Sequence, residues 1–442
     1  MIKSFADIFK IPELKKRVLF TLGIIAAYRL GAAIPVPGVD AGALKTLFEM
    51  HRNSLLGFLD MFSGGALNKL SIFSLGIMPY INASIIMSLL QGAHVMPYLD
   101  RLAKEGELGR KKITQITRYG TLILGTIQAI GLAIGITRMS PPGGIPIVTN
   151  PSTSWLLLTI LTLITGTVFI MWMGEQITER GIGNGISLMI FAGIVDRLPS
   201  AIFNMVRLIR LDEMSILSAM ALVALVFGIT AAVVWVETAQ RKIPVQYAKR
   251  IVGRKMYGGA STFLPLKVDQ SGVIAVIFAI SLLSVPLTIG QFFPNTPLGK
   301  IIIDIWSRGS VLYDLLLAGL VIFFCYFYNS VQFNPRDIAE NMKKWGGFVP
   351  GIRPGEPTAQ YIQRILERIT LGGALFVAAI AVLPDYLRRM FNAPFWFGGT
   401  SLLIVVGVAL DTIGQIESHL IMRHYEGFIK DGRIKGRWFN VK

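Results

Sequence analysis

The chain has 442 residues, of which 53% are apolar and only 16% are charged, and its formal net charge is +17. Soluble domains carry about a quarter charged residues, so this composition excludes an ordinary soluble enzyme and a disordered chain. The single cysteine, Cys325, excludes an internal disulfide framework, and four scattered histidines form no metal-binding cluster. What remains is a polytopic membrane protein with a large excess of basic residues.

Ten apolar stretches are long enough to cross a bilayer, which requires about 20 mostly apolar residues in a helix. They are residues 18–35, 71–92, 113–137, 154–174, 182–206, 214–236, 270–292, 311–333, 369–388 and 398–418. The first is not a cleavable signal peptide, because no small-residue cleavage site follows it. Long apolar stretches do not fit an outer-membrane barrel, whose strands alternate over short segments. The sequence therefore predicts an all-α polytopic membrane protein with ten transmembrane helices.

A shorter apolar segment, residues 55–67, lies between the first two spans and ends in a glycine pair. It is too short to cross the membrane, and it contains Asp60. One interpretation is an interfacial or loop helix. The other is a short re-entrant helix, which is tolerated at membrane depth only where protein or water surrounds it.

Basic residues are distributed unevenly over the loops that connect the ten spans. If the N-terminus is cytoplasmic, the inner segments hold 31 of the 43 Lys and Arg residues and the outer loops hold 11. Arg29 lies inside the first span and completes the total. By the positive-inside rule, this asymmetry predicts a multi-pass protein with both termini in the cytoplasm.

Two inner loops, residues 237–269 and 334–368, are longer than simple connectors need to be. The first alternates polar and apolar residues around Tyr247 and includes a Gly-Gly pair, which suggests a projecting hairpin. The second places Arg353 between Pro and Gly residues that fix a turn. Retention of positive charge on the inner side explains the sign of these loops. Their length and turn chemistry suggest docking on an acidic protein face or on RNA phosphates.

Groups that carry chemistry are scarce in the spans. The exceptions are Arg29, the pair Asp196 and Arg197, Asp411 and Glu417, and we expect Asp411 to be a packed, hydrogen-bonded residue. Residues 181–185 (GIGNG) lack the Lys-Ser/Thr of a phosphate loop, so they are interpreted as a tight turn that opens a helix. The chain is therefore predicted not to be an enzyme, and no cofactor or metal is expected.

Six sequence motifs, in order along nearly the whole chain, resemble the SecY family of central channel subunits of the bacterial protein translocase. They are residues 62–67 (FSGGAL), 71–81 (SIFSLGIMPYI), 174–187 (GEQITERGIGNGIS), 246–250 (QYAKR), 348–355 (FVPGIRPG) and 398–404 (GGTSLLI). The resemblance implies a clamshell of two pseudo-symmetric five-helix halves, 1–202 and 214–442, joined by a hinge loop at 203–213. It also implies a passive channel that moves unfolded secretory polypeptides across the membrane and releases transmembrane segments sideways into lipid.

The resemblance assigns residues to four parts of such a channel. The pore ring would comprise Ile77, Ile81, Ile186, Ile190, Ile277 and Ile404. The plug beneath it, on the outer side, would comprise Gly57, Phe58, Leu59, Asp60, Met61, Phe62, Ser63, Gly64 and Gly65. Polar residues of a lateral gate would be Asn82, Ser88 and Asn184. Docking residues for a motor or the ribosome would be Arg250, Arg254, Lys255 and Arg353.

The resemblance further implies partners and a location. The partners would be SecE-like and SecG-like small membrane subunits, a SecA motor ATPase, the ribosome with contact to its RNA, signal sequences, nascent polypeptides and the lipid bilayer. The location would be the bacterial cytoplasmic membrane. Two alternatives stay open on the residues alone: an ion-coupled small-solute transporter that uses Asp411, and a membrane insertase or scaffold without a pore.

Overall fold

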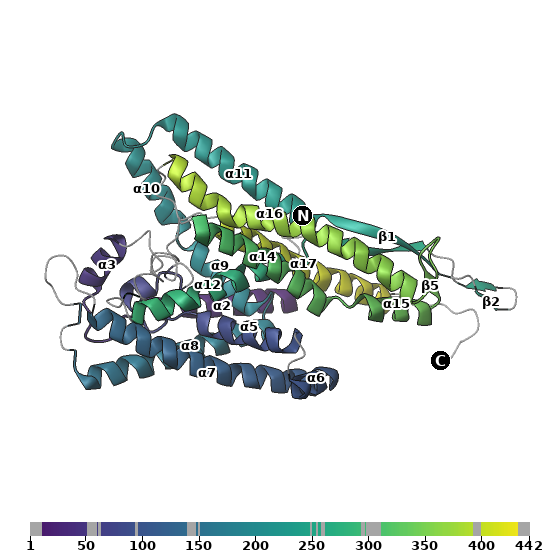
Figure 1. Ribbon diagram of the computed structural model, residues 1–442, viewed down its shortest axis with the longest axis horizontal. Coiled ribbons are helices and arrows are strands. Elements are labelled where there is room, and N and C mark those ends of the chain that lie inside the picture. The colour runs from purple at the N-terminus through teal and green to yellow at the C-terminus, as the bar shows by residue number, and fades with distance from the viewer. Residues whose placement is uncertain are drawn as a thin grey trace.

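The computed structural model is an elongated bundle of helices with a small β-sheet projecting from one end (Figure 1). The structure describes residues 11–50, 60, 63–92, 96–138, 147–148, 151–247, 250–252, 255–257, 261–292, 297, 311–391 and 399–431. The bundle end that carries the sheet is called the sheet end below.

The first part of the chain is entirely helical apart from turns and isolated bridges, within the described ranges. Its elements are α2 (Pro12–Ala33), α3 (Ala41–Met50), η1 (Leu67–Lys69), α5 (Met78–Gly92), α6 (Pro97–Lys104), α7 (Glu107–Arg138), α8 (Thr153–Arg180), α9 (Gly185–Val195) and α10 (Leu198–Arg210).

The second part mixes helices with short strands. Its elements are α11 (Ile216–Thr238), β1 (Gln240–Tyr247), β2 (Arg250–Val252), β3 (Lys255–Tyr257), β4 (Ser261–Lys267), α12 (Gly272–Phe292), α14 (Val311–Gln332), α15 (Pro335–Lys344), β5 (Gly347–Phe348), α16 (Glu356–Phe391) and α17 (Gly399–Asp431).

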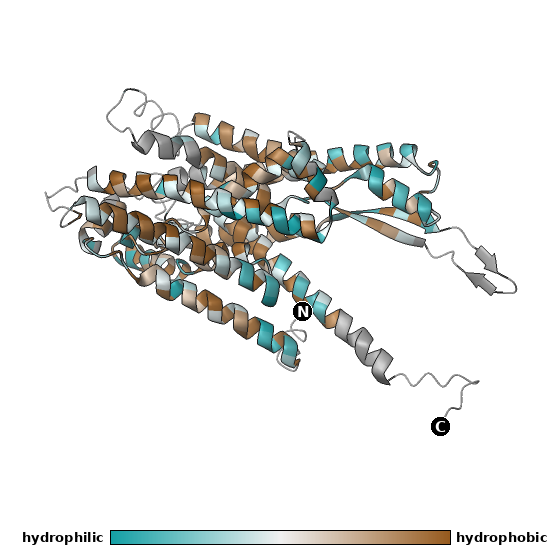
Figure 2. Cartoon of the chain, turned by 90° about the horizontal axis from the view of Figure 1, so that it is seen from below, coloured by the Kyte–Doolittle hydropathy of each residue, from teal (hydrophilic) through white to brown (hydrophobic). Residues whose placement is uncertain are grey.

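Each of the ten expected spans contains a helix of the structure. Seven described helical stretches, with α9 and α10 counted together and α14 and α15 counted together, are long and apolar enough to cross a membrane on length and composition alone. The other three expected spans correspond to α2, α5 and α12. Apolar residues dominate the middle of the bundle, and polar residues gather toward the sheet end (Figure 2). The predicted all-α membrane fold is therefore confirmed.

Two spans that were expected to be continuous helices are interrupted. Residues 71–77 of the second span form turns, with Gly76 at φ 57°, and α5 begins only at Met78, with Pro79 in its first turn. The fifth span is split into α9 and α10, because Pro199 lacks a backbone N–H and therefore occupies the first turn of a new helix.

The segment expected as a hinge loop, residues 203–213, is a loop only at its end. α10 continues to Arg210, and the chain then turns through Asp212, which has φ 56°. Apolar and basic residues alternate at helical spacing through α10, so the helix is favoured up to this point. The change of direction between α10 and α11 is confined to residues 211–215.

One large apolar cluster forms the centre of the bundle. It joins buried residues of α2, α5, α8, α9, α12, α14, α16 and α17. A smaller cluster packs Leu14, at the start of α2, with Ile182 and with Ile416 and Leu420 of α17. The beginning of α2 and the later part of α17 therefore lie at the same end of the bundle.

The two long loops of the sequence meet in one sheet. β1 pairs antiparallel with β4, from Gln240 opposite Lys267 to Gln246 opposite Ser261, which confirms the expected hairpin. β1 also pairs with β5, with Gln246 opposite Phe348, so the strand order is β4-β1-β5. Ile243 and Leu266 of the hairpin pack against Val349, Ile362 and Leu366 of the second loop and α16.

Candidate functional site

Six isoleucines from different helices belong to the central apolar cluster or pack against it. Ile77, Ile81, Ile190, Ile277 and Ile404 are all at most 6% exposed, and Ile186 is half-buried and packs against the same cluster. They come from the start of α5, from α9, from α12 and from α17. The residues expected to form a pore ring thus share one large apolar cluster, although they come from widely separated parts of the chain.

The spacing of each isoleucine pair fixes its direction. The carbonyl of Ile77 accepts a hydrogen bond from the N–H of Ile81 at 3.1 Å, so helical geometry extends back to Ile77 although α5 begins one residue later. A Cβ placed on Gly174 of α8 would lie 3.3 Å from Ile186 Cγ1 and 3.8 Å from Ile77 Cδ1. Gly174 therefore lies beside both isoleucines.

A tight turn at residues 181–184 positions α9, as the sequence analysis expected. Gly183 has φ 86°, and its N–H donates to Gln415 Oε1 of α17 at 2.8 Å. Asn184 is the N-cap of α9, and its side-chain oxygen accepts from the N–H groups of Ile186 and Ser187. The expected gate residue Asn184 therefore has a structural task in orienting Ile186.

Residues 63–65 of the expected plug form a compact turn, whereas Asp60 before them is helical. Gly64 and Gly65 have φ values of 66° and 82°, which glycine adopts without strain, and a 3₁₀ turn, η1, follows. A Cβ on Gly64 would lie 3.0 Å from Gly193 Cα in α9. The expected helix at 55–67 thus does not extend through residues 63–65, while Gly57, Phe58, Leu59, Met61 and Phe62 lie outside the described residues.

The turn lies on one side of the isoleucines along α9. Ile186, Ile190 and Gly193 are spaced at i, i+4 and i+7, so they share a face of that helix. The start of α9 lies near α17 and the beginning of α2, whereas Gly193, which contacts the turn, is near its other end. The turn therefore lies beyond the isoleucines on the side away from the start of α9.

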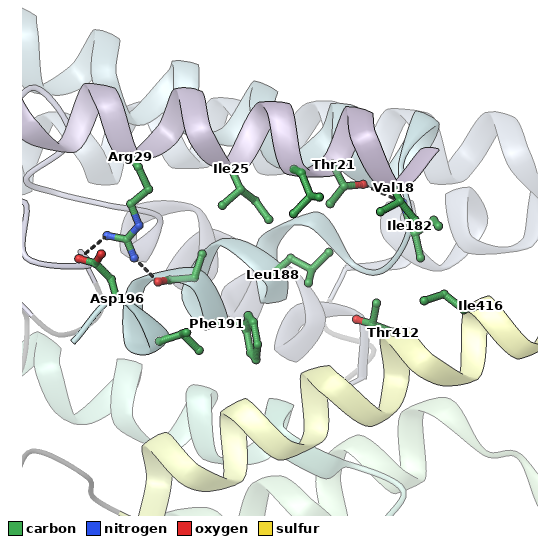
Figure 3. A pocket seen from close by; sticks show the side chains of 13 residues that line it. Val18, Thr21, Ile25, Arg29, Ile182, Leu188, Phe191, Asp196, Thr412 and Ile416 are labelled. Carbon is green, nitrogen blue, oxygen red and sulfur yellow. Dashed lines mark hydrogen bonds and ion pairs between the residues drawn. The ribbon is translucent and has the colours of Figure 1, made fainter. Parts of the chain in front are cut away.

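Charged residues surround this turn, of which only Asp60 was expected there, as part of the plug. Arg29 Nη1 donates to the carbonyl of Gly64 at 3.0 Å and lies 3.3 Å from Asp196 Oδ2, and Arg197 Nη2 lies 2.5 Å from Asp60 Oδ2. Figure 3 shows Arg29 directed toward Asp196, at one end of an apolar cavity of about 440 Å³ between α2, α9 and α17. The sequence signal that could have pointed to these residues was the presence of ionised side chains in otherwise apolar spans.

The helices expected to flank a lateral gate are in contact in this structure. α12 packs against α5 and α7, and a Cβ on Gly92, at the end of α5, would lie 2.6 Å from the Phe327 ring of α14. Asn82 is buried in α5 at 7% exposure, and Ser88 is half-buried one and a half turns further on. Both polar residues lie on α5, the helix that contacts α7, α12 and α14.

The expected docking residues lie around the sheet. Arg353 is exposed, and it lies between Gly351 (φ 81°) and Gly355 (φ 104°) in a turn closed by a hydrogen bond from Thr358 Oγ1 to its carbonyl, at 2.8 Å. Arg250 begins β2 and Lys255 begins β3, with Arg250 opposite Tyr257. Arg254 lies outside the described residues.

Buried carboxylates occur at the junction of the sheet and the bundle. Asp269 is 4% exposed, and its Oδ1 accepts from the N–H of Gly272 at 2.8 Å and from Ser271 Oγ at 3.0 Å. Burial raises the pKa of the Asp269 carboxyl, and these hydrogen bonds oppose the rise. Asp411 is exposed on α17, not packed as expected, because α17 runs on past the buried part of the bundle and none of its residues 409–421 is buried. Within the described ranges, no group of three or more His, Cys, Asp or Glu residues is arranged to hold a metal ion.

The fold therefore defines the class of protein: a multi-pass helical membrane bundle whose centre is filled with apolar side chains. The SecY family model matches residues 71–413. The protein translocase subunit SecY of Escherichia coli K12 is 48% identical over 427 residues, covering 96% of each chain. SecY of Aquifex aeolicus is 45% identical over 424 residues, covering 96% of this chain and 98% of its own. The chain belongs to the SecY family.

Solved channel structures share the fold at low sequence identity. A structure described as a protein conducting channel aligns with a TM-score of 0.60 at 17% identity, covering 95% of this chain and 94% of its own. Sec61 in a canine ribosome-channel complex aligns with a TM-score of 0.56 at 15% identity, covering 95% and 94%. The ten-helix clamshell is thus the architecture of this chain.

Proposed function

We propose that this chain is a protein-conducting channel through which unfolded polypeptides cross the membrane. The observation that carries the proposal is the convergence of six isoleucines from four regions of the chain on one apolar centre. An apolar constriction opposes wetting and excludes ions while it is closed, yet it exposes no fixed charge that would bind a passing chain. The relatives that match over nearly their full length are named protein translocase subunits, which supports the same function.

In this proposal, Ile77, Ile81, Ile186, Ile190, Ile277 and Ile404 form the ring. The segment around Asp60, Ser63, Gly64 and Gly65 then seals the pore on the outer side, together with the rest of residues 57–65. A polypeptide entering from the sheet end spreads the ring and displaces this segment.

Sideways release of apolar segments would occur where α5 and α7 meet α12 and α14, past Asn82 and Ser88. A helix that reaches this boundary would partition by its own transfer energy, in which a central charge costs about 2.5–3.5 kcal/mol. Signal sequences and transmembrane segments of nascent chains are the substrates that such a boundary selects.

The sheet end provides the docking surface in this proposal. β1, β4 and β5 link the two long loops, so Arg353 and the hairpin that includes Arg250, Arg254 and Lys255 would engage a partner together. Their positive charge suits an acidic face of a SecA-like motor or the phosphates of ribosomal RNA. In this proposal the motor or the ribosome drives transport, and the chain acts as a passive pore rather than a catalyst.

Small membrane subunits would complete the assembly. We assign a SecE-like subunit to the hinge side, where Ile202 and Phe203 of α10 are 55% and 75% exposed. A SecG-like subunit would add elsewhere on the bundle. The basic loops orient the protein with its sheet end and both termini in the cytoplasm, in the cytoplasmic membrane of a bacterium.

Reconstituted vesicles test this proposal. Vesicles containing the chain and its co-purifying small subunits are supplied with a SecA-type motor, ATP and a secretory precursor, and the precursor that becomes resistant to protease is measured. We expect protected precursor only when motor and ATP are both present. Its absence, in parallel with a working control translocase, would contradict the proposal.

A further inference from the structure

We propose that Arg29, Asp60, Asp196 and Arg197 form a latch that holds the plug segment, described here at Asp60 and residues 63–68, in its closed position, and that transport requires this latch to open. Arg197 and Arg29 are therefore positioning residues for gating. The inference rests on the proposed channel function, since it assigns a gate to that channel.

Asp60 is the centre of the latch. Its Oδ2 lies 2.5 Å from Arg197 Nη2, and the same guanidinium donates to the Asp60 carbonyl at 2.7 Å. Its Oδ1 accepts from the N–H of Asn68 at 2.9 Å, and its Oδ2 accepts from Asn68 Nδ2 at 3.2 Å. Asp60 thus joins the turn that ends at Asn68 to the segment between α9 and α10.

The α2 helix contributes a second set of contacts. Arg29 donates through Nη1 to the carbonyl of Gly64 at 3.0 Å and through Nη2 to the carbonyl of Ala192. Tyr28 donates its hydroxyl to the carbonyl of Ser63 at 3.2 Å. Asp196 lies 3.3 Å from Arg29 Nη1 and holds that guanidinium between α2 and α9 (Figure 3). The plug segment is therefore held from two helices at once.

Burial gives these contacts their strength. The side chain of Asp60 is 7% exposed and that of Arg197 is 23% exposed, so little water competes for either charge. Separating such a pair inside the protein leaves an uncompensated charge, which is strongly unfavourable. If the segment moves outward instead, both groups gain water and the cost of separation falls. The ion pair is therefore stable while the segment is in place, and it costs little to separate once the segment has moved outward. This is the behaviour of a two-state gate.

The latch is connected to the isoleucine ring through α9. Ile186 and Ile190 lie on the helix face that also carries Gly193, against which Gly64 packs. Arg197 follows two residues after the end of α9. A polypeptide that pushes α9 outward to widen the ring would therefore carry Arg197 away from Asp60. Ring opening and plug release are coupled by one rigid element.

The test is a double-mutant cycle in the full-length chain, purified with its small subunits and placed in lipid bilayers. The variants are Asp60→Asn, which keeps an acceptor for Asn68, Arg197→Gln and the double variant. Arg207→Gln, at an exposed position of α10, is the matched control. Hydrogen–deuterium exchange of the amides at 63–70 reports latch opening, and ion conductance of the bilayer reports the pore.

We expect each single variant to accelerate exchange about tenfold, as loss of a partly buried ion pair would. The double variant should exchange no faster than the quicker single variant, because the two residues act through one contact. Arg197→Lys, which keeps the charge but loses the fork, should lie between the wild-type chain and Arg197→Gln. Arg207→Gln should match the wild-type chain.

Unchanged exchange in both single variants, or effects that add in the double variant, would overturn the latch. The conductance measurement separates this result from failure of the channel. If a chain lacking residues 57–66 conducts no ions, the proposed channel is contradicted whatever the exchange data show. If that deletion conducts while Asp60→Asn does not raise conductance above the wild-type level, the latch does not gate the pore and the inference fails.

Discussion

Gly185 at the start of α9 lies directly against the carbonyl oxygen of Gly174 in α8: a Cβ added to Gly185 would be 1.9 Å from that oxygen. No side chain fits between the two backbones, so α8 and α9 meet at the distance that glycine alone permits. Because Ile186 follows immediately, this contact also determines where the first isoleucine of α9 lies.

Gly185→Ala is expected to destabilise the folded protein by about 1–3 kcal/mol or more, since the backbone of α8 cannot move aside as a flexible side chain would. Thermal unfolding of the purified protein in mild detergent measures this. Gly228→Ala in α11, where a Cβ would meet nothing within 4 Å, is the control and should be neutral or stabilising. Equal unfolding temperatures for the two variants would refute the tight contact.

Ile404→Asn should make the closed channel leak ions. Ile404 is 0% exposed within the apolar cluster, and an amide there without a hydrogen-bond partner costs about 1–3 kcal/mol and attracts water. Ion conductance of planar bilayers containing the variant should rise above that of the wild-type chain. Ile404→Val keeps the apolar character and should stay sealed. If the ion conductance of the Ile404→Asn variant is no higher than that of Ile404→Val, Ile404 is not part of the ring.

Arg353→Glu should impair motor-driven export without changing the fold. Arg353 is exposed in its Gly-bounded turn, so the substitution reverses a surface charge and disturbs no packing. The rate of precursor protection in vesicles should fall, while the unfolding temperature stays the same. Arg364→Glu makes the same charge change at an exposed position of α16 and should retain export. Equal loss in both variants would indicate a general charge effect instead of docking at the turn.

Asp269 is expected to make stability depend on pH. Because burial raises its pKa in the folded state, the folded protein holds this proton more tightly than the unfolded chain does. The stabilisation is present at low pH and is lost as pH rises through the raised pKa. Asp269→Asn, which keeps an acceptor for Gly272, should therefore raise the unfolding temperature at pH 8 and change it less at pH 4.

The matched control for that prediction is Asp337→Asn, at an exposed position in the first turn of α15. It should leave the difference between the two pH values as in the wild-type chain. If Asp269→Asn shifts the unfolding temperature equally at pH 4 and pH 8, the pKa of the Asp269 carboxyl is the same in the folded and the unfolded protein, and the prediction is wrong.

The spans were predictable from the sequence because hydropathy acts locally: twenty apolar residues have few alternatives to a membrane helix. The tight turn before α9 and the β1–β4 hairpin were also predictable, since glycine placement and alternation are local signals. The interruption of the second span at residues 71–77 was missed because those residues are as apolar as the helix that follows.

Contacts between distant segments could not be predicted in this way. β5 pairs with β1 although about a hundred residues separate them in the chain. No local pattern at Gly347 or Phe348 predicts that pairing. Likewise, Asp60 and Arg197 are 137 positions apart, and each alone resembles a charged residue at the end of an apolar stretch. The convergence of the isoleucines followed only from the family resemblance, because isoleucine is common in every span.

Photo-crosslinking of a stalled polypeptide tests the central claim most directly. A photoreactive residue replaces Ile77, Ile190, Ile277 or Ile404 in turn, a precursor is arrested during motor-driven transport, and its covalent adducts are measured. Phe227 of α11, which is 72% exposed on the outside of the bundle, is the control position. We predict adducts from the four isoleucine positions and none from position 227. Protected precursor that accumulates without adducts at any isoleucine position would contradict passage through this ring.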